Sequence, residues 1–118
     1  MIFDAYRAQV SLLVRTIPFV AAEACFALKG GTAINLFVRD MPRLSVDIDL
    51  TYLPVHDRAT SLAAIEAALL RVKARIEAGI PQVRVTLART QGENALTKLV
   101  IATLAAQIKI EVTPVLRG

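Results

Sequence analysis

The hydrophobic and polar positions of this chain follow two different periods. Apolar residues recur every three or four positions over residues 3–16 and again over residues 57–78, which predicts amphipathic helices. Pro18 interrupts the first pattern, so a separate short helix is expected over residues 19–24. Gly79, followed by Pro81, predicts the end of the long second helix. We interpret that long helix as a packing element that covers a sheet.

Between and after these helices the period changes to two, which is typical of half-buried strands. Residues 45–50 alternate strictly, and this strand is expected to end near residue 52 or 53. Further strands are expected over residues 26–28, 82–88, 96–104 and 108–113. The apolar run over residues 32–39 is expected to form a helix. The order of elements is then helices, a β–α–β unit and an antiparallel meander. It predicts an α+β fold, a mixed β-sheet with helices mainly on one face.

A glycine pair lies where the short strand 26–28 meets the predicted helix. Gly30 and Gly31 directly precede Thr32, and Lys29 precedes the pair. Glycine lets backbone N–H groups approach an anion closely, and a helix N-terminus offers unpaired donors. The Thr32 hydroxyl adds a donor. This segment is a candidate phosphate-binding site.

The alternating strand 45–50 carries the second chemical signal. Ser45, Asp47 and Asp49 are expected on one face and apolar residues on the other. Two carboxylates two residues apart on one strand repel each other unless a cation lies between them, and hard oxygen ligands favour Mg²⁺ or Mn²⁺. A phosphate site followed closely by such a strand points to nucleoside triphosphate chemistry.

At these residues the chain resembles the AbiEii/AbiGii-type toxin nucleotidyltransferases, within the polymerase-β-like nucleotidyltransferase superfamily. The resemblance rests on Lys-Gly-Gly-Thr at 29–32 and Arg-x-Ser-x-Asp-x-Asp at 43–49. It implies a nucleotidyltransferase-like fold for residues 1–118 as a single domain, and a third carboxylate on a later strand, which we assign to Glu111. The implied catalytic and metal-binding residues, holding two Mg²⁺ or Mn²⁺ ions, are Asp47, Asp49 and Glu111. The implied nucleotide-binding residues are Lys29, Gly30, Gly31, Thr32, Arg43 and Ser45.

The resemblance also implies a reaction and partners. The reaction moves a nucleoside monophosphate from a nucleoside triphosphate to a hydroxyl acceptor, expected to be RNA such as tRNA. The protein is expected to be the toxin of a toxin–antitoxin or phage-defence pair, with an antitoxin protein as partner. Members of the family continue into a mostly helical C-terminal half, so this chain is expected to be the N-terminal part of a longer protein.

Composition limits these expectations. The chain has 118 residues, 55% of them hydrophobic, and a mean hydropathy of +0.53. No apolar run reaches the ~20 residues of a membrane span, and no signal peptide is recognisable, so a cytoplasmic protein without membrane contact is expected. The excess of apolar residues suggests covered surface, such as a homodimer interface. The net charge of +4 is compatible with RNA binding and equally with an ordinary protein surface. Few aromatics argue against a base-stacking platform.

Alternatives remain for the function and for single residues. The chain is alternatively a non-catalytic nucleotide- or partner-binding module of the same fold. A metal-dependent glycosyltransferase also uses Asp-x-Asp, but 118 residues are too few for its nucleotide-sugar domain. Glu111 is alternatively a solvated glutamate paired with Lys98 or Lys109, and Arg43 a surface arginine. His56 is interpreted as a loop residue and not as a base.

Overall fold

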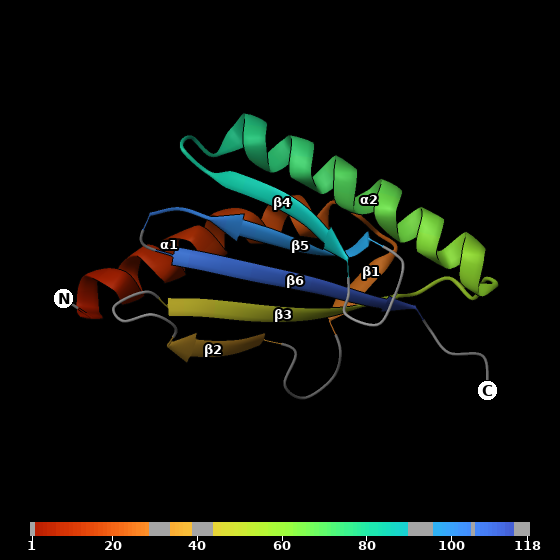
Figure 1. Ribbon diagram of the computed structural model, residues 1–118, viewed down its shortest axis with the longest axis horizontal. Coiled ribbons are helices and arrows are strands. Elements are labelled where there is room, and N and C mark those ends of the chain that lie inside the picture. The colour runs from red at the N-terminus through yellow and green to blue at the C-terminus, as the bar shows by residue number, and fades with distance from the viewer. Residues whose placement is uncertain (1, 29–33, 39–43, 90–95, 105, 115–118) are drawn as a thin grey trace.

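The structure, a computed structural model, describes residues 2–28, 34–38, 44–89, 96–104 and 106–114. These residues form two helices and six strands (Figure 1). In chain order they are α1 (Ile2–Ala21), β1 (Phe26–Leu28), β2 (Ile34–Val38), β3 (Leu44–Tyr52), α2 (Arg58–Gly79), β4 (Arg84–Arg89), β5 (Leu96–Ala102) and β6 (Ala106–Pro114). Neither described helix is long and apolar enough to cross a membrane.

All six strands belong to one mixed sheet. The order is β1-β3-β6-β5-β4, and β2 also pairs with β3. The central pair, β3 and β6, is parallel, and every other pairing is antiparallel. Figure 1 shows β6 between β3 and β5. The meander β4–β5–β6 and the α+β mixed sheet predicted from the sequence are therefore confirmed.

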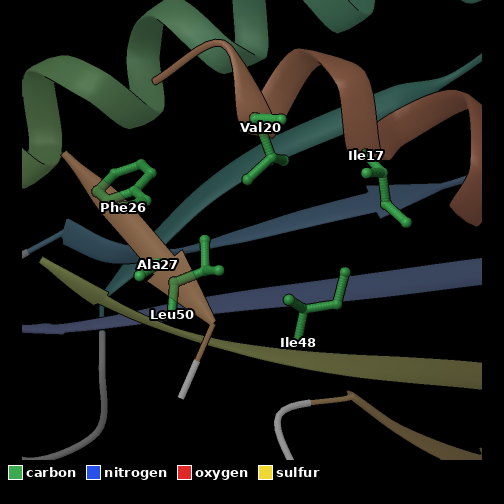
Figure 2. Close-up of a pocket in the computed structure, with 7 residues that line it drawn as sticks. Ile17, Val20, Phe26, Ala27, Ile48 and Leu50 are labelled. Carbon is green, nitrogen blue, oxygen red and sulfur yellow. The ribbon is translucent and has the colours of Figure 1, made fainter. Parts of the chain in front are cut away.

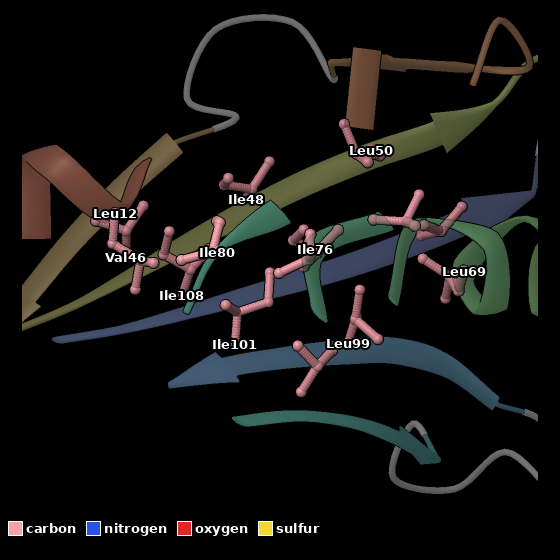
Figure 3. Close-up of a cluster of buried hydrophobic side chains, with 14 of the residues drawn as sticks. Leu12, Val46, Ile48, Leu50, Leu69, Ile76, Ile80, Leu99, Ile101 and Ile108 are labelled. Atoms are coloured by element: carbon pink, nitrogen blue, oxygen red, sulfur yellow. The ribbon is translucent and has the colours of Figure 1, made fainter. Parts of the chain in front are cut away.

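One face of this sheet forms the core. Alternate residues of β3, β5 and β6 point to that face and pack against both helices (Figure 3). The buried set includes Leu12 of α1, Ile65, Leu69, Val72 and Ile76 of α2, and the strand residues Val46, Ile48, Leu50, Leu99, Ile101, Ile108, Ile110 and Val112. Burial of this apolar surface is the main driving force for folding. Because both helices pack on one face, the expected one-sided arrangement is also confirmed.

The remaining strand residues point to the opposite side of the sheet. We call this side the open face. Its described members are Asp47, Asp49 and Thr51 on β3, Gln107, Lys109, Glu111 and Thr113 on β6, Lys98, Val100 and Ala102 on β5, and Arg84, Thr86 and Ala88 on β4. The two faces differ sharply in chemistry because side chains alternate along a strand.

The break expected at Pro18 does not occur. One helix, α1, continues through Pro18 to Ala21. Proline cannot donate a hydrogen bond to the carbonyl four residues earlier, which belongs to Val14. Val14 and Pro18 are both exposed, so the missing bond lies on the solvent side of α1. The next turn is closed by the amide of Ala22, which donates to the Pro18 carbonyl over 3.2 Å. The prediction of a second helix over 19–24 was wrong.

The prediction of a helix over residues 32–39 was also wrong for the part that is described, residues 34–38. Ile34–Val38 form β2, which pairs antiparallel with Leu44–Ile48 of β3. The run is short and rich in β-branched and aromatic residues, and a short apolar run does not distinguish helix from strand by itself. Strand β1 pairs only with residues 50–52 of β3, so residues 44–48 on the same edge supply the hydrogen-bond partners of β2. The expected β–α–β unit is therefore replaced by two short strands, β1 and β2, along one edge of β3.

An ion-pair cluster joins the turn after α1 to α2. Glu23 is buried, and its Oε1 accepts a hydrogen bond from Arg71 Nη2 over 2.7 Å, while its Oε2 accepts one from Arg75 Nη1 over 2.6 Å. Arg71 Nε also donates to both carboxylate oxygens, over 3.1 and 3.3 Å. The cluster holds the start of β1 against the middle of α2.

Candidate functional site

The three predicted carboxylates lie together on the open face. In the parallel pair of β3 and β6, Asp47 is the register partner of Lys109, and Asp49 is the partner of Glu111. A one-residue change of register would have placed Glu111 on the helix-covered face. Instead, all three acids line one small cavity of about 60 Å³. Its lining residues are Asp47, Ile48, Asp49, Lys98, Lys109 and Glu111.

The apolar neighbours of the aspartates hold them in this orientation. Ile48 lies between Asp47 and Asp49, is only 3% exposed, and belongs to the core. On the helix-covered side of Ile48, a cavity of about 200 Å³ lies between α1 and the strands β1 and β3 (Figure 2). The residues that line this cavity are all apolar, namely Ile17, Val20, Ala21, Phe26, Ala27, Ile48 and Leu50. It therefore offers no partner for a phosphate or a metal ion.

One atom of the acidic group lacks a partner. Oδ1 of Asp47 is buried and accepts no hydrogen bond. A buried carboxylate oxygen without a partner is costly, and a bound cation would satisfy it. The donor set, carboxylate oxygens only, fits a hard divalent ion such as Mg²⁺. However, among the described residues no three His, Cys, Asp or Glu side chains lie close enough to hold one ion together. The acids thus have the right chemistry and share a cavity, but they do not form a closed three-ligand set.

Two lysines lie beside the acids, and sequence reasoning considered them only as ion partners of Glu111. Lys109 precedes Glu111 by two residues on β6, and Lys98 is the register partner of Glu111 on β5. Both line the same cavity as the acids. Ion pairs among the described residues include those of Glu23 with Arg71 and Arg75 and that of Lys73 with Glu77. None of them joins these lysines to the cavity's carboxylates. The period-two pattern of 108–113 was the signal that placed Lys109 with Glu111.

Of the predicted nucleotide-binding residues, the structure describes only Ser45. Lys29, Gly30, Gly31, Thr32 and Arg43 lie outside the described residues. The described residues on either side of 29–33 are Leu28, which pairs with Leu50, and Ile34, which pairs with Ile48. Asp49 lies between these two partners on β3, so Leu28 and Ile34 lie on either side of its register position. Ser45 lies in β3, where its register partners are Phe37 and Gln107.

The single histidine is remote from this chemistry. His56 lies exposed between β3 and α2, and its Nδ1 is 3.3 Å from the hydroxyl of Tyr52. Tyr52 itself is buried in the core. The two rings are tilted, with centroids 5.9 Å apart. The interpretation of His56 as a loop residue agrees with this position.

Comparison with known proteins gives one finding. A family model described as the nucleotidyl transferase AbiEii toxin, type IV TA system, matches residues 11–118. No curated protein and no solved structure matches the chain. The matched region contains β3, β6 and all three candidate acids.

Proposed function

The chain belongs to the AbiEii family of nucleotidyl transferase toxins of type IV toxin–antitoxin systems, and we propose that it transfers a nucleoside monophosphate from a nucleoside triphosphate to a hydroxyl group of RNA, tRNA included. The observation that supports this most is the position of Asp47, Asp49 and Glu111. They come from two neighbouring parallel strands and line one cavity on the open face. Such a carboxylate group is the recognised means of holding divalent ions for phosphoryl chemistry.

In this proposal the acids of β3 and β6 bind Mg²⁺ or Mn²⁺. Two bound ions would stabilise both the attacking and the leaving oxygen of an in-line displacement. Asp47, with its unpartnered Oδ1, and Asp49 would hold them from β3, and Glu111 would do so from β6. The acceptor hydroxyl oxygen forms a bond to the α-phosphorus, the bond from that phosphorus to the bridging oxygen breaks, pyrophosphate leaves, and the hydroxyl proton is released.

The triphosphate is expected at the edge of β3 that carries β1 and β2. The glycine segment follows Leu28 and precedes Ile34, and these two residues lie there on either side of Asp49. Gly30, Gly31 and Thr32 would bind phosphate oxygens through N–H and hydroxyl donors. Lys29, Arg43 and Ser45 would neutralise or hydrogen-bond the same phosphates.

Protein partners are part of the proposal. The family implies an antitoxin protein. Val10, Val14 and Ile17 are large apolar residues that lie exposed along α1, and apolar surface of this kind suits an interface with a second copy of the chain.

A non-catalytic module of the same fold is the second candidate. The specific observation in its favour is that no three ligand side chains of the described residues converge. Such a protein would bind a nucleotide or a partner through the same open face without transfer.

The test compares the protein with an Asp47→Asn/Asp49→Asn variant. Each α-labelled nucleoside triphosphate is supplied in turn with Mg²⁺ and total RNA, and label incorporated into RNA is measured. We expect incorporation with the protein and none with the variant. Glu77→Gln, which changes an exposed carboxylate of α2, is the matched control and is expected to retain activity.

A second readout separates the candidates. Mg²⁺ should raise the melting temperature of the protein but not of the double variant, because a ligand that binds only the native state stabilises it. Nucleotide binding that depends on Mg²⁺, without label in any RNA, would favour the non-catalytic module. Equal incorporation by the protein and the double variant would refute the assigned acids.

A further inference from the structure

Positive residues lie on the open face of β6, β5 and β4, the three strands on one side of β3. Lys109 is next to Asp47, one strand across on β6, and Lys98 is next to Glu111, one strand further on β5. Arg84, exposed on β4, pairs with Ala102, which in turn pairs with Gln107. The three positive residues therefore lie on β6, β5 and β4, while the aspartates lie on β3. On β4 and β5 the described open-face residues include no acid.

The surface between these positive residues carries short side chains. The described open-face residues there are Thr86, Ala88, Val100 and Ala102, all with short side chains. A second cavity, of about 380 Å³, lies at the far end, where Arg84 and Ala102 contribute to its wall. Its other lining residues are Gln82, Val83, Thr103 and Leu104. Short side chains and positive residues thus lie on the open face between the acidic cavity and this second cavity.

We propose that the open face of β6, β5 and β4 binds the phosphate backbone of the acceptor polynucleotide, with Lys109, Lys98 and Arg84 as its phosphate contacts. The inference rests on the proposed function, since it assigns the acceptor side of the same site. Lysine and arginine neutralise phosphates, and such contacts fix the position of a nucleic acid without reading its sequence.

The proposed acceptor surface and the expected triphosphate site lie on opposite sides of β3. The glycine segment, where the triphosphate is expected, is bounded by Leu28 and Ile34 at the other edge of β3. Arg84 lies three strands from β3, a distance of ~14 Å across the sheet. The backbones of Lys98 and Lys109 are ~8 Å apart, one strand across and two residues along. Positive residues spread over three strands in this way suit a polymer with a phosphate on every nucleotide better than one triphosphate group.

The same surface indicates how the polynucleotide is recognised. Among the described open-face residues there is no aromatic side chain on which a base could stack. Binding through Lys109, Lys98 and Arg84 should therefore be insensitive to base sequence and should weaken steeply with salt.

The test measures RNA binding without catalysis. A fluorescent single-stranded RNA is titrated with the protein in EDTA, without nucleotide, and anisotropy is followed at several salt concentrations. We expect Lys98→Gln, Lys109→Gln and Arg84→Gln each to weaken binding severalfold, equally for RNAs of different sequence. The triple variant should reduce the slope of log K against log salt by ~2, since single strands give ~0.7 per phosphate contact.

The matched control is Lys73→Gln. Lys73 lies on α2, on the helix side of the sheet, and pairs with Glu77 over 3.2 Å. It should leave RNA affinity and the salt slope unchanged. Arg84 is exposed, so its variant tests the proposal even where a change at a half-buried lysine lowers stability.

The transfer assay supplies the second arm. If the cations bind the acceptor, the variants should raise KM for RNA and leave KM for the nucleoside triphosphate unchanged. A raised KM for the nucleotide with normal RNA binding would overturn the inference and assign these residues to the triphosphate. RNA affinity equal to that of Lys73→Gln would also overturn it. RNA binding that the variants weaken, in a protein that transfers no nucleotide, would support the inference while the proposed function fails.

Discussion

Glu23 offers a sharp test of how the fold is held together. Its carboxylate is 6% exposed and accepts hydrogen bonds from Arg71 and Arg75, with shortest distances of 2.7 and 2.6 Å. The substitution Glu23→Gln preserves the size of the side chain but removes its charge. It leaves two arginines facing a neutral amide, whose NH₂ group cannot accept their hydrogen bonds.

The structure sets the size of the expected loss. Hydrogen bonds to charged groups contribute about 1.5–3 kcal/mol each, and removing one partner of a fully buried ion pair costs about 3–5 kcal/mol. Here the side chains of Arg71 and Arg75 are 53% and 39% exposed, so water can solvate them once the carboxylate is gone. We therefore expect Glu23→Gln to lower the free energy of unfolding by about 1–3 kcal/mol, which is roughly 4 °C in melting temperature per kcal/mol for a chain of this length.

The loss should depend on pH in a defined direction. Hydrogen bonding from Arg71, opposed by burial and joined by hydrogen bonding from Arg75, holds the pKa of Glu23 below its ordinary value. A group with a lowered pKa in the folded state stabilises the protein above its unfolded pKa, and this stabilisation disappears as pH falls through the folded pKa. The difference between the protein and Glu23→Gln should thus be full at pH 7 and narrow progressively below about pH 4.5, the ordinary value.

The assay is thermal unfolding followed by circular dichroism at pH 7 and through the acid range. Glu77→Gln makes the same chemical change on α2, where the 3.2 Å pair with Lys73 is partly exposed, and it should cost less than about 0.5 kcal/mol. A loss for Glu23→Gln no larger than that of Glu77→Gln would refute the reasoning. A loss that stays constant into strong acid would show that packing, and not charge, is responsible.

Two further predictions concern the core and one turn. Leu99→Ala removes a side chain that is 0% exposed between the sheet and α2, and should destabilise the protein by about 2–5 kcal/mol in urea unfolding; a loss below about 1 kcal/mol would mean that the described packing is wrong. Gln82 has a φ of 58°, a conformation that side chains other than glycine adopt at a cost. Gln82→Gly should therefore raise the free energy of unfolding by up to about 1 kcal/mol in the same assay, whereas a clear destabilisation would show that the turn relies on the glutamine side chain.

Much of the candidate site was predictable from local pattern alone. Side chains of a strand alternate between two faces regardless of the rest of the chain, so Asp47 and Asp49 had to share a face once 45–50 was read as a strand. The same argument applied to Lys109 and Glu111. The long helix was equally clear, because its apolar spacing and the stop at Gly79 and Pro81 agree with one another.

Other features depended on partners distant in sequence. Residues 34–38 are apolar on nearly every position, so their period was ambiguous, and the edge of β3 decided that they form a strand. Pro18 was compatible with a continuous helix only because it lies on the exposed side of α1, which packs by its other side. Neither fact is encoded in the local pattern.

Local alternation is enough to predict which residues of each strand share a face, because it is a property of extended backbone. Which strands become neighbours depends on the packing of the whole chain. Glu111 lies beside Asp49, and Lys98 beside Glu111, because β6 inserts between β3 and β5. That placement arises when strands far apart in the chain bury their apolar faces against the same two helices.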